Sequence, residues 1–324
     1  MRLRKYLVPL ALLVASLGAH AKGTGYVFVS SEKDHVVTVF EPGSLKKVKE
    51  IQTSERPRAM KFSADHSKLY VACGDDDAID VIDVASLTVE KSIAIGDDPD
   101  RFDISPDGKY LYASNEDEGL LTIYDLGADE VVAEIEVGEE PEGVLVSPDN
   151  QRVYVTSEVA NIVHVVDASS RELVANIVVG NRPRRFALTP DQKQLWVTNE
   201  VGGTVTIIDP ASNQVVGEIE FKPKGFRAED VTPVGMVMTR DGATAYVTLG
   251  GANHFAVVDV PTREVKQYVL VGKRAWGVAL SPDERTLYVT NGKSDDMSVI
   301  DTGSLKVVRS VPAGRVPHDV VVDN

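Results

Sequence analysis

The chain has 324 residues, of which 43% are hydrophobic and 26% are charged, a composition typical of a globular protein that excludes a disordered or fibrous chain. Its net charge of −15 at pH 7 disfavours nonspecific binding to nucleic acid or to an anionic lipid surface. The single cysteine, Cys73, excludes an intramolecular disulfide bond, a CxxCH haem motif and a four-cysteine metal site.

The first 21 residues have the pattern of a secretory signal peptide. Three basic residues precede a short apolar run over residues 6–17, and Ala19 and Ala21 stand at the two positions that signal peptidase reads. We therefore expect cleavage after Ala21 and a periplasmic protein. The apolar run is shorter than the roughly 20 residues that a membrane-spanning helix needs, and no later segment is long and apolar enough, so no membrane span is expected.

An internal repeat runs through the rest of the chain. Its most regular marker is an aromatic residue followed by small or β-branched residues, and successive copies lie 42 residues apart except for one interval of 50. The seven aromatic anchors are Phe28, Tyr70, Tyr112, Tyr154, Trp196, Tyr246 and Tyr288. An acidic residue follows each anchor after 13 positions, from Glu41 to Asp301, and a proline opens the next unit in all but one case. Three markers in one register indicate a repeat architecture.

Each unit holds four short runs rich in Val, Ile, Thr and Tyr, separated by turn sequences such as Ser105-Pro-Asp-Gly. Four strands per repeat and seven repeats predict an all-β fold, a seven-bladed β-propeller of four-stranded blades that forms one domain over residues 22–324. The chain opens at a second-strand position, Phe28, and ends after a first-strand run over residues 319–322. We therefore expect the C-terminal strand to complete the N-terminal blade and close the ring.

The repeated residues themselves are expected to be structural. The aromatic anchors should pack between blades. The recurrent acids should accept hydrogen bonds from the backbone of the turn that follows them, because seven copies arranged in a ring cannot all be catalytic.

The motifs Tyr288-Val-Thr-Asn and Trp196-Val-Thr-Asn, together with the Ser-Pro-Asp-Gly turn, resemble the YVTN family of β-propeller repeats over essentially all of residues 24–324. This resemblance implies the fold and says little about function, because the motif residues are structural. Residues 24–35 and 53–58 resemble a narrower subgroup, the propellers associated with pyrroloquinoline quinone (PQQ)-dependent alcohol catabolism and its transport components. That resemblance implies an accessory protein of a periplasmic alcohol-oxidation system, and no catalytic residue set comes with it.

Charged residues gather in the loops that lead into the first strand of each unit, the strand that lines the channel of a propeller. Two successive loops are mainly acidic and most others are basic, which predicts an acidic arc facing a basic arc at the channel mouth. The candidate ligand-binding residues are Arg58, Arg182, Arg184, Arg185, Arg274, Trp276 and His318. Arginine pairs with carboxylates and indole stacks on flat rings, so this set can hold PQQ. The alternative is that these residues are solvated and only keep the loops soluble.

If these residues bind a ligand, reversing Arg184 and Arg185 to glutamate is expected to abolish binding but to leave thermal stability nearly intact. The fifth unit also contains eight additional residues near residues 222–232, on the same face. Phe226 and Arg227 in this insertion can form a lid or a partner contact, or the segment can be a tolerated surface insertion.

The acidic run over residues 75–77, with Asp80, offers oxygen ligands of the kind that Ca²⁺ takes. Its spacing is not that of an EF-hand loop, so we expect a solvated polar loop and assign no metal site.

We therefore predict a non-enzymatic binding or assembly protein that acts as a monomer. It would recognise PQQ or a partner such as a periplasmic alcohol dehydrogenase or a transport component, with no nucleic-acid partner and no catalytic residue assigned. Two alternatives stay open. One is a lactonase-like hydrolase at the channel mouth, for which His318, Glu142 and Arg184 are the candidate residues, and the other is a structural protein–protein platform without a small ligand.

Overall fold

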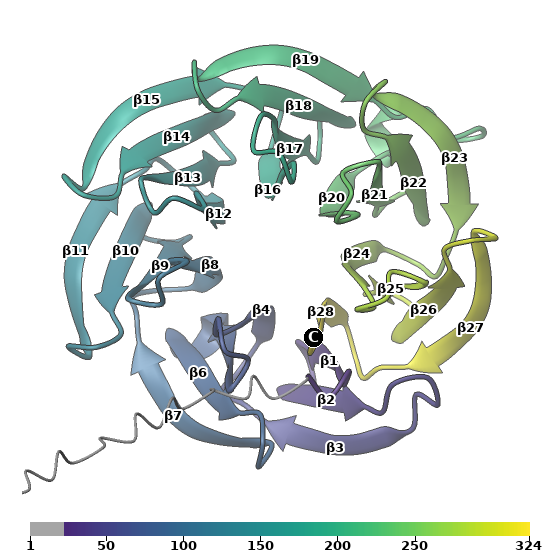
Figure 1. Ribbon diagram of the computed structural model, residues 1–324, viewed down its shortest axis with the longest axis horizontal. Helices are drawn as coiled ribbons and strands as arrows, with labels where there is room; N and C mark the ends of the chain where they lie inside the picture. Colours follow the sequence, from purple (N-terminus) through teal and green to yellow (C-terminus); the bar gives the residue numbers. More distant parts are fainter. Residues whose placement is uncertain (1–22) are drawn as a thin grey trace, which may run out of the picture.

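The computed structural model describes residues 23–324, so the predicted signal peptide lies outside the described residues. Seven four-stranded antiparallel sheets stand around a central axis (Figure 1), and the predicted seven-bladed propeller is confirmed. We number the blades 1 to 7 along the chain and give the strands of each from the centre outward.

Blade 1 is formed by β28 (Pro317–Val322), β1 (Val27–Ser31), β2 (Val36–Phe40) and β3 (Lys47–Gln52). Blade 2 is formed by β4 (Pro57–Phe62), β5 (Lys68–Cys73), β6 (Ala78–Asp83) and β7 (Thr88–Ala94). Blade 3 is formed by β8 (Pro99–Ile104), β9 (Tyr110–Asn115), β10 (Leu120–Asp125) and β11 (Glu130–Glu136). Blades 4 and 5 are formed by β12 (Pro141–Val146), β13 (Arg152–Ser157), β14 (Ile162–Asp167) and β15 (Glu172–Val178), and by β16 (Pro183–Leu188), β17 (Leu195–Asn199), β18 (Thr204–Asp209) and β19 (Gln214–Glu220). Blades 6 and 7 are formed by β20 (Pro233–Met238), β21 (Thr244–Leu249), β22 (His254–Asp259) and β23 (Glu264–Leu270), and by β24 (Ala275–Leu280), β25 (Thr286–Asn291), β26 (Asp296–Asp301) and β27 (Lys306–Pro312).

Helix is confined to two short 3₁₀ segments in the described chain, η1 (Gly74–Asp76) and η2 (Ala228–Asp230). No helix of residues 23–324 has both the length and the apolar character needed to cross a membrane.

The ring closes as the phase of the repeat predicts. The last strand, β28, pairs with β1 in register Val27↔Val322 and Val29↔Val320, so the two ends of the described chain share blade 1. The backbone N–H of Thr24 donates a hydrogen bond of 2.7 Å to the Asp323 carboxylate beside this pairing. Closure leaves no inner strand of the ring without a partner.

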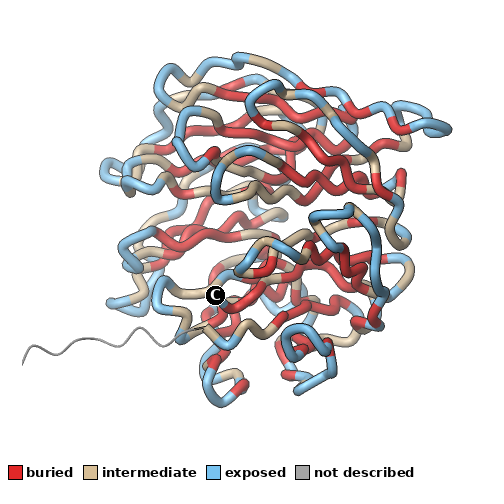
Figure 2. Tube along the Cα trace, turned by 45° about the vertical axis from the view of Figure 1, so that its right-hand side comes forward, coloured by how far each residue is buried: buried red, intermediate tan, exposed pale blue. Residues whose placement is uncertain are grey.

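The core lies between the blades. Tyr112 of blade 3 belongs to one apolar cluster with Val146 and Val153 of blade 4, and Trp196 of blade 5 packs with Ala245 and Val247 of blade 6. The second and third strands of the blades are almost wholly buried, whereas the outer strands and many of the turns are exposed (Figure 2). The expectation that the aromatic anchors pack between blades is confirmed.

The recurrent acids bind the turns that follow them, as predicted. The Asp167 carboxylate accepts hydrogen bonds from the backbone N–H groups of Ser169 and Ser170, both at 3.0 Å, and Asp83 accepts one from Ser86 at 2.8 Å. These bonds lower the pKa of Asp167 and hold it ionised, so the side chain acts as a fixed turn element.

Candidate functional site

The inner strands share a β-bulge near their start, and this bulge shapes the channel mouth. In β16 the register shifts between Pro183 and Phe186, and the same shift recurs at the start of the other inner strands. Strict strand alternation would send Arg184 and Arg185 to opposite faces. Because of the bulge, both guanidinium groups contact the carboxylate of Glu142 in the neighbouring blade.

Several side chains at the mouth reach past a neighbouring blade. Arg101 of blade 3 pairs with Asp319 of blade 1 at 3.2 Å, and Arg274 of blade 7 pairs with Glu200 of blade 5 at 2.7 Å. The blades joined by each pair are not adjacent, so these contacts are made across the mouth of the central channel.

Arg184 is the centre of a buried ionic network. Its guanidinium lies 2.5 Å from Glu142, 3.0 Å from Glu158 and 2.9 Å from Glu200. Arg184 and its neighbour Arg185 are only 6% and 5% exposed. Burial, followed by the hydrogen bond and charge of Glu142, raises the pKa of Glu158 to about 10, so Glu158 holds its proton at neutral pH.

Arg58 holds two more carboxylates. Its Nε donates to Glu32 at 2.9 Å, and its Nη1 pairs with Asp100. Burial opposes ionisation of Asp100, but the charges of Arg58 and Arg185 outweigh it and hold the pKa of Asp100 well below its usual range. Asp100 is therefore an anion at neutral pH and screens the positive charge of Arg58.

A pocket of about 420 Å³ opens beside this network. Its lining comprises Glu32, Arg58, Arg274, Trp276, Gly292, Lys293, Val316, Pro317 and His318. The lining holds three cations and one carboxylate, and two of the cations are paired with carboxylates outside it, Arg58 with Asp100 and Arg274 with Glu200. No carboxylate of the described residues lies within 4 Å of the Lys293 ammonium. This pocket at the channel mouth is called the mouth pocket below.

His318 and Trp276 form one wall of the mouth pocket. Their rings lie 5.1 Å apart, and the guanidinium of Arg274 stacks over the indole at 4.4 Å. His318 is 2% exposed, and neither ring nitrogen has a hydrogen-bond partner among the described residues; its Nε2 lies 3.8 Å from Glu32 Oε1. Burial, followed by the charges of Arg58 and Arg185, holds the pKa of His318 well below its usual range, so the imidazole is neutral at pH 7.

The structure brings together most of the predicted ligand residues, but it also pairs them. Arg58, Arg274, Trp276 and His318 line the mouth pocket, whereas Arg182, Arg184 and Arg185 lie outside it. All five arginines are bound to carboxylates. The charges of the expected acidic and basic arcs do not stay apart: Arg58 of blade 2 pairs with Asp100 of blade 3, and Arg184 and Arg185 of blade 5 pair with Glu142 of blade 4. The expectation that Arg184 and Arg185 can be reversed without loss of stability is contradicted as well, because both are buried.

Four acidic residues at the mouth were missed by sequence reasoning. Glu32, Glu116, Glu158 and Glu200 each stand four positions after an aromatic anchor, at the end of the second strand. The signal was present in the repeat, where the other three units carry glycine at this position. The pattern alone did not indicate a role, because the role depends on arginines of other units that contact Glu32, Glu158 and Glu200.

Glu116 differs from the other three in this ring. No cation of the described residues lies within 4 Å of its carboxylate, whereas Glu32, Glu158 and Glu200 each pair with arginine. Burial, followed by the charges of Asp100 and Glu142, raises the pKa of Glu116 to about 7. The mouth therefore holds a carboxyl group that gains or loses its proton near neutral pH.

Replacing Glu116 with glutamine should stabilise the protein, and more so at pH 8 than at pH 5. The folded-state pKa lies above the unfolded value, so unfolding releases a proton between the two values and the stability of the native protein falls as pH rises toward 7. Glutamine has no proton to lose in this range, so the variant does not show this fall in stability. Urea unfolding at the two pH values measures the difference, with the exposed Asp117→Asn as the matched control; an equal effect of Glu116→Gln at both values would contradict the pKa assignment.

The insertion lies beside the mouth and not in the mouth pocket. Phe226 packs edge-on against the ring of His254 with the centroids 5.5 Å apart, and Arg227 pairs with Glu229 and Asp230 while remaining exposed. Its last residue before β20, Thr232, lies 3.5 Å from Arg274 Nη1. A lid role of Phe226 and Arg227 stays a prediction.

The acidic run of blade 2 is engaged by the protein itself. Asp75 pairs with Arg56 at 2.6 Å, Asp76 accepts a hydrogen bond from the backbone of Glu55, and the buried Asp80 accepts one from the backbone of Ser54. Within residues 23–324 no group of three or more His, Cys, Asp or Glu side chains has the arrangement to hold a metal ion.

Two family models match parts of the chain. Residues 26–152 match a YNCE-like beta-propeller, and residues 174–324 match a lactonase described as a 7-bladed beta-propeller. No curated protein sequence matches the chain significantly.

Solved structures with the same fold have low sequence identity. A hydrazine synthase chain from Kuenenia stuttgartiensis is 24% identical with a TM-score of 0.78, over 90% of this chain and 99% of that one. The periplasmic gluconolactonase of Pseudomonas aeruginosa is 20% identical with a TM-score of 0.79, over 92% and 99%. At these identities the likeness establishes the fold alone, and the finer resemblance to the PQQ-associated subgroup stays a prediction.

Proposed function

We propose that the protein is an exported hydrolase that opens an anionic lactone in the mouth pocket. The observation that carries this proposal is the composition of the pocket, where a buried neutral imidazole, one carboxylate and three cations converge. The lactonase-like alternative is thereby preferred to the non-enzymatic reading. It is supported by the match of residues 174–324 to a lactonase model, since that segment supplies Arg274, Trp276, Lys293 and His318.

The chemistry of lactone opening assigns a role to each of these groups. Water adds to the carbonyl carbon of the cyclic ester, and Glu32 accepts the proton that the water loses. Arg274 and Lys293 stabilise the oxyanion that forms and attract the negative charge of the substrate. The ring C–O bond then breaks, and the alkoxide takes a proton back from Glu32 to give the hydroxy acid.

His318 is better suited to position the substrate through hydrogen bonds than to act as the general base. A neutral imidazole offers one N–H donor and one lone pair, and both ring nitrogens are without partners in the described protein. Because its pKa is strongly lowered, the ring does not hold a proton at neutral pH, so the base role falls to Glu32. Glu142 and Arg184, the other two sequence candidates, bind each other and hold the shape of the mouth.

The proposal predicts that purified protein accelerates hydrolysis of sugar lactones, anionic ones above neutral ones. Acid release from glucuronolactone, gluconolactone and a phosphorylated gluconolactone, followed with a pH indicator against the spontaneous rate, measures this. Glu32→Gln should lower kcat by about 100-fold or more, the range of a lost general base. Arg274→Gln should raise KM chiefly for the anionic substrates.

The exposed Lys193→Ala, whose side chain is 81% exposed and outside the pocket, is the matched control and should leave kinetics unchanged. Absence of any acceleration by the unaltered protein over the whole lactone panel would refute the hydrolase proposal.

A second candidate uses the same pocket without catalysis. The cationic side chains of the lining and the indole of Trp276 also suit a flat polyanion such as PQQ, which keeps the accessory role in periplasmic alcohol oxidation as a proposal. A ligand present at 100 times its dissociation constant adds about 2.7 kcal/mol to the stability of the folded state. A rise in melting temperature with PQQ, lost in Arg274→Gln and combined with no lactone hydrolysis, would favour this candidate over the hydrolase.

A further inference from the structure

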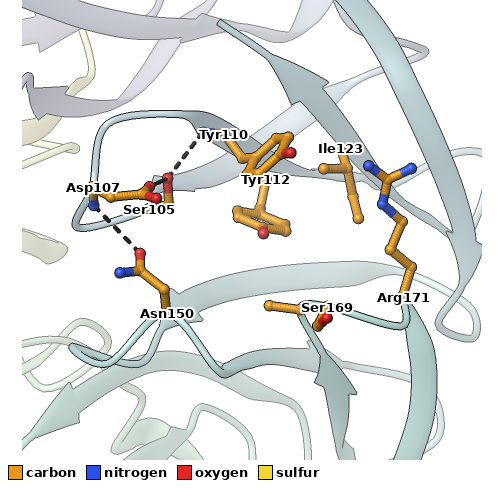
Figure 3. A pocket seen from close by; sticks show the side chains of 9 residues that line it. Ser105, Asp107, Tyr110, Tyr112, Ile123, Asn150, Ser169 and Arg171 are labelled. Carbon is orange, nitrogen blue, oxygen red and sulfur yellow. Dashed lines mark hydrogen bonds between the residues drawn. The ribbon is translucent and has the colours of Figure 1, made fainter.

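A second pocket lies between blades 3 and 4, on the face opposite the mouth. Its volume is about 290 Å³, and the loops that border it join first to second strands and third to fourth strands. Figure 3 shows the two rings of Tyr110 and Tyr112 on one side, Asn150 and Ser169 on the other, and Arg171 at one end. This inter-blade pocket shares no residue with the mouth pocket.

The polar groups of the inter-blade pocket have unused hydrogen-bonding capacity. The guanidinium of Arg171 donates from Nη1 to the backbone oxygen of Val132 at 2.8 Å, and no carboxylate of the described residues lies within 4 Å of it. The amide oxygen of Asn150 accepts from the backbone of Asp107 at 3.3 Å, which leaves its NH₂ group free to donate. An arginine with a free edge is suited to a carboxylate, which it binds through two parallel hydrogen bonds.

The tyrosines supply the apolar wall. Tyr112 is 2% exposed, and its ring meets that of Tyr110 at a centroid distance of 6.3 Å. Burial raises the pKa of Tyr112 to about 12, so its hydroxyl is neutral and can donate a hydrogen bond. Since a water molecule occupies about 30 Å³ of liquid, the volume corresponds to about ten waters, which suits a ligand with one six-membered ring.

The repeat explains why this groove is open. The residue 17 positions after each anchor has a positive φ in all seven blades. Leucine stands there in three blades: Leu45 packs with Tyr288, Leu87 with Phe28, and Leu305 against the cluster of Tyr246. Beside Tyr112 the same position is Arg171, so a charged side chain stands where leucine packs against the anchor in those three blades.

We propose that the inter-blade pocket binds a small ring-shaped carboxylate, such as a sugar acid, with its carboxylate on Arg171 and its ring against Tyr110 and Tyr112. The hydroxyl groups of the ring would meet the amide of Asn150 and the hydroxyl of Ser169. The lining also includes the Asp107 carboxylate, which lies at the other end of the pocket from Arg171 (Figure 3) and is held by the Ser105 hydroxyl at 2.7 Å and the Lys109 ammonium at 3.1 Å. Arg171 is the cation of the lining, and it favours a monoanion over a neutral ring.

The test is calorimetric or ligand-observed NMR titration of the mature protein with glucuronate, benzoate and glucose. Glucuronate should bind, and glucose, which lacks the carboxylate, should bind at least roughly tenfold more weakly. Preference for benzoate would support the site and assign the ring as aromatic. No binding of either carboxylate at millimolar concentration would overturn the proposal.

Arg171→Leu is the decisive variant, because the fold already carries leucine at this repeat position in three other blades. It should lose at least roughly tenfold in glucuronate affinity while keeping or raising the melting temperature. Arg263→Leu is the matched control: Arg263 has the same repeat position and donates to the backbone oxygen of Val216 at 2.9 Å, but its groove has Trp196 in place of Tyr112. Equal loss of affinity in both variants, or none in Arg171→Leu, would contradict the site, and Glu32→Gln should leave binding here intact.

Discussion

Replacing Arg184 with leucine should lower the free energy of unfolding by about 3–5 kcal/mol at pH 8, the cost of removing one partner from a buried ion pair. Arg184 is 6% exposed and is shared by Glu142, Glu158 and Glu200. Without the guanidinium, these carboxyl groups lie close together in a region from which water is largely excluded, and the ionised ones among them lose their counter-charge. Their mutual repulsion and their desolvation then oppose folding.

The pH dependence separates this explanation from simple loss of packing. Protonation relieves the buried charge, so the destabilisation by Arg184→Leu should shrink between pH 8 and pH 5. Denaturant unfolding followed by fluorescence and circular dichroism measures both values. Arg227→Leu, at a side chain that is 73% exposed and paired only at the surface, is the control and should change stability by less than about 1 kcal/mol. A loss of equal size at both pH values would show that packing and not charge is what Arg184 contributes.

Removing residues 317–324 should abolish cooperative folding of the remaining chain. The deletion takes away β28, and with it Val320 and Val322, which are 2% and 7% exposed in the core of blade 1. Each buried valine contributes about 1.5–3 kcal/mol, and the loss adds to an unpaired edge on β1, so the total approaches the 5–15 kcal/mol that stabilise a typical domain. His318 and Asp319 leave the channel as well.

A peptide supplied in trans makes this experiment specific. A synthetic peptide of residues 315–324 should restore a folded ring, seen as a recovered thermal transition and a compact elution volume. The same peptide with Val320→Asp and Val322→Asp should fail, because it would bury two carboxylates in the blade. A truncated chain that melts with an unchanged midpoint would show that ring closure contributes little.

The architecture could be predicted from the sequence because the repeat pattern of a propeller occurs seven times in this chain. Aromatic anchors such as Tyr112, acids such as Asp167 and the turn prolines each have one local reason to stand where they do, and that reason recurs every 42 residues. Burial between blades and the turn hydrogen bonds of the acids followed from these positions without knowledge of long-range contacts. The closing strand also followed, because the phase of the repeat at residue 28 and at residue 322 leaves one strand missing at one end and one spare at the other.

The functional site was only partly accessible. The sequence placed Arg58, Arg274, Trp276 and His318 at the channel mouth, because they precede or open the inner strands. The sequence did not show which arginines pair with which carboxylates. Arg274 contacts Glu200 from two blades away, and the bulge of β16 turns both Arg184 and Arg185 toward Glu142, so neither pairing follows from spacing along the chain.

The sequence by itself therefore determined the number of blades, the strands and the closure of the ring, since these depend on short-range patterns repeated in one register. The tertiary structure alone decided that the arginines of the mouth are bound by Glu32, Glu142, Glu158 and Glu200, and that no cation of residues 23–324 pairs with Glu116. The physical reason is that electrostatic energies depend on distances across the ring. Those distances are set by strand bulges and side-chain directions that a single sequence does not record.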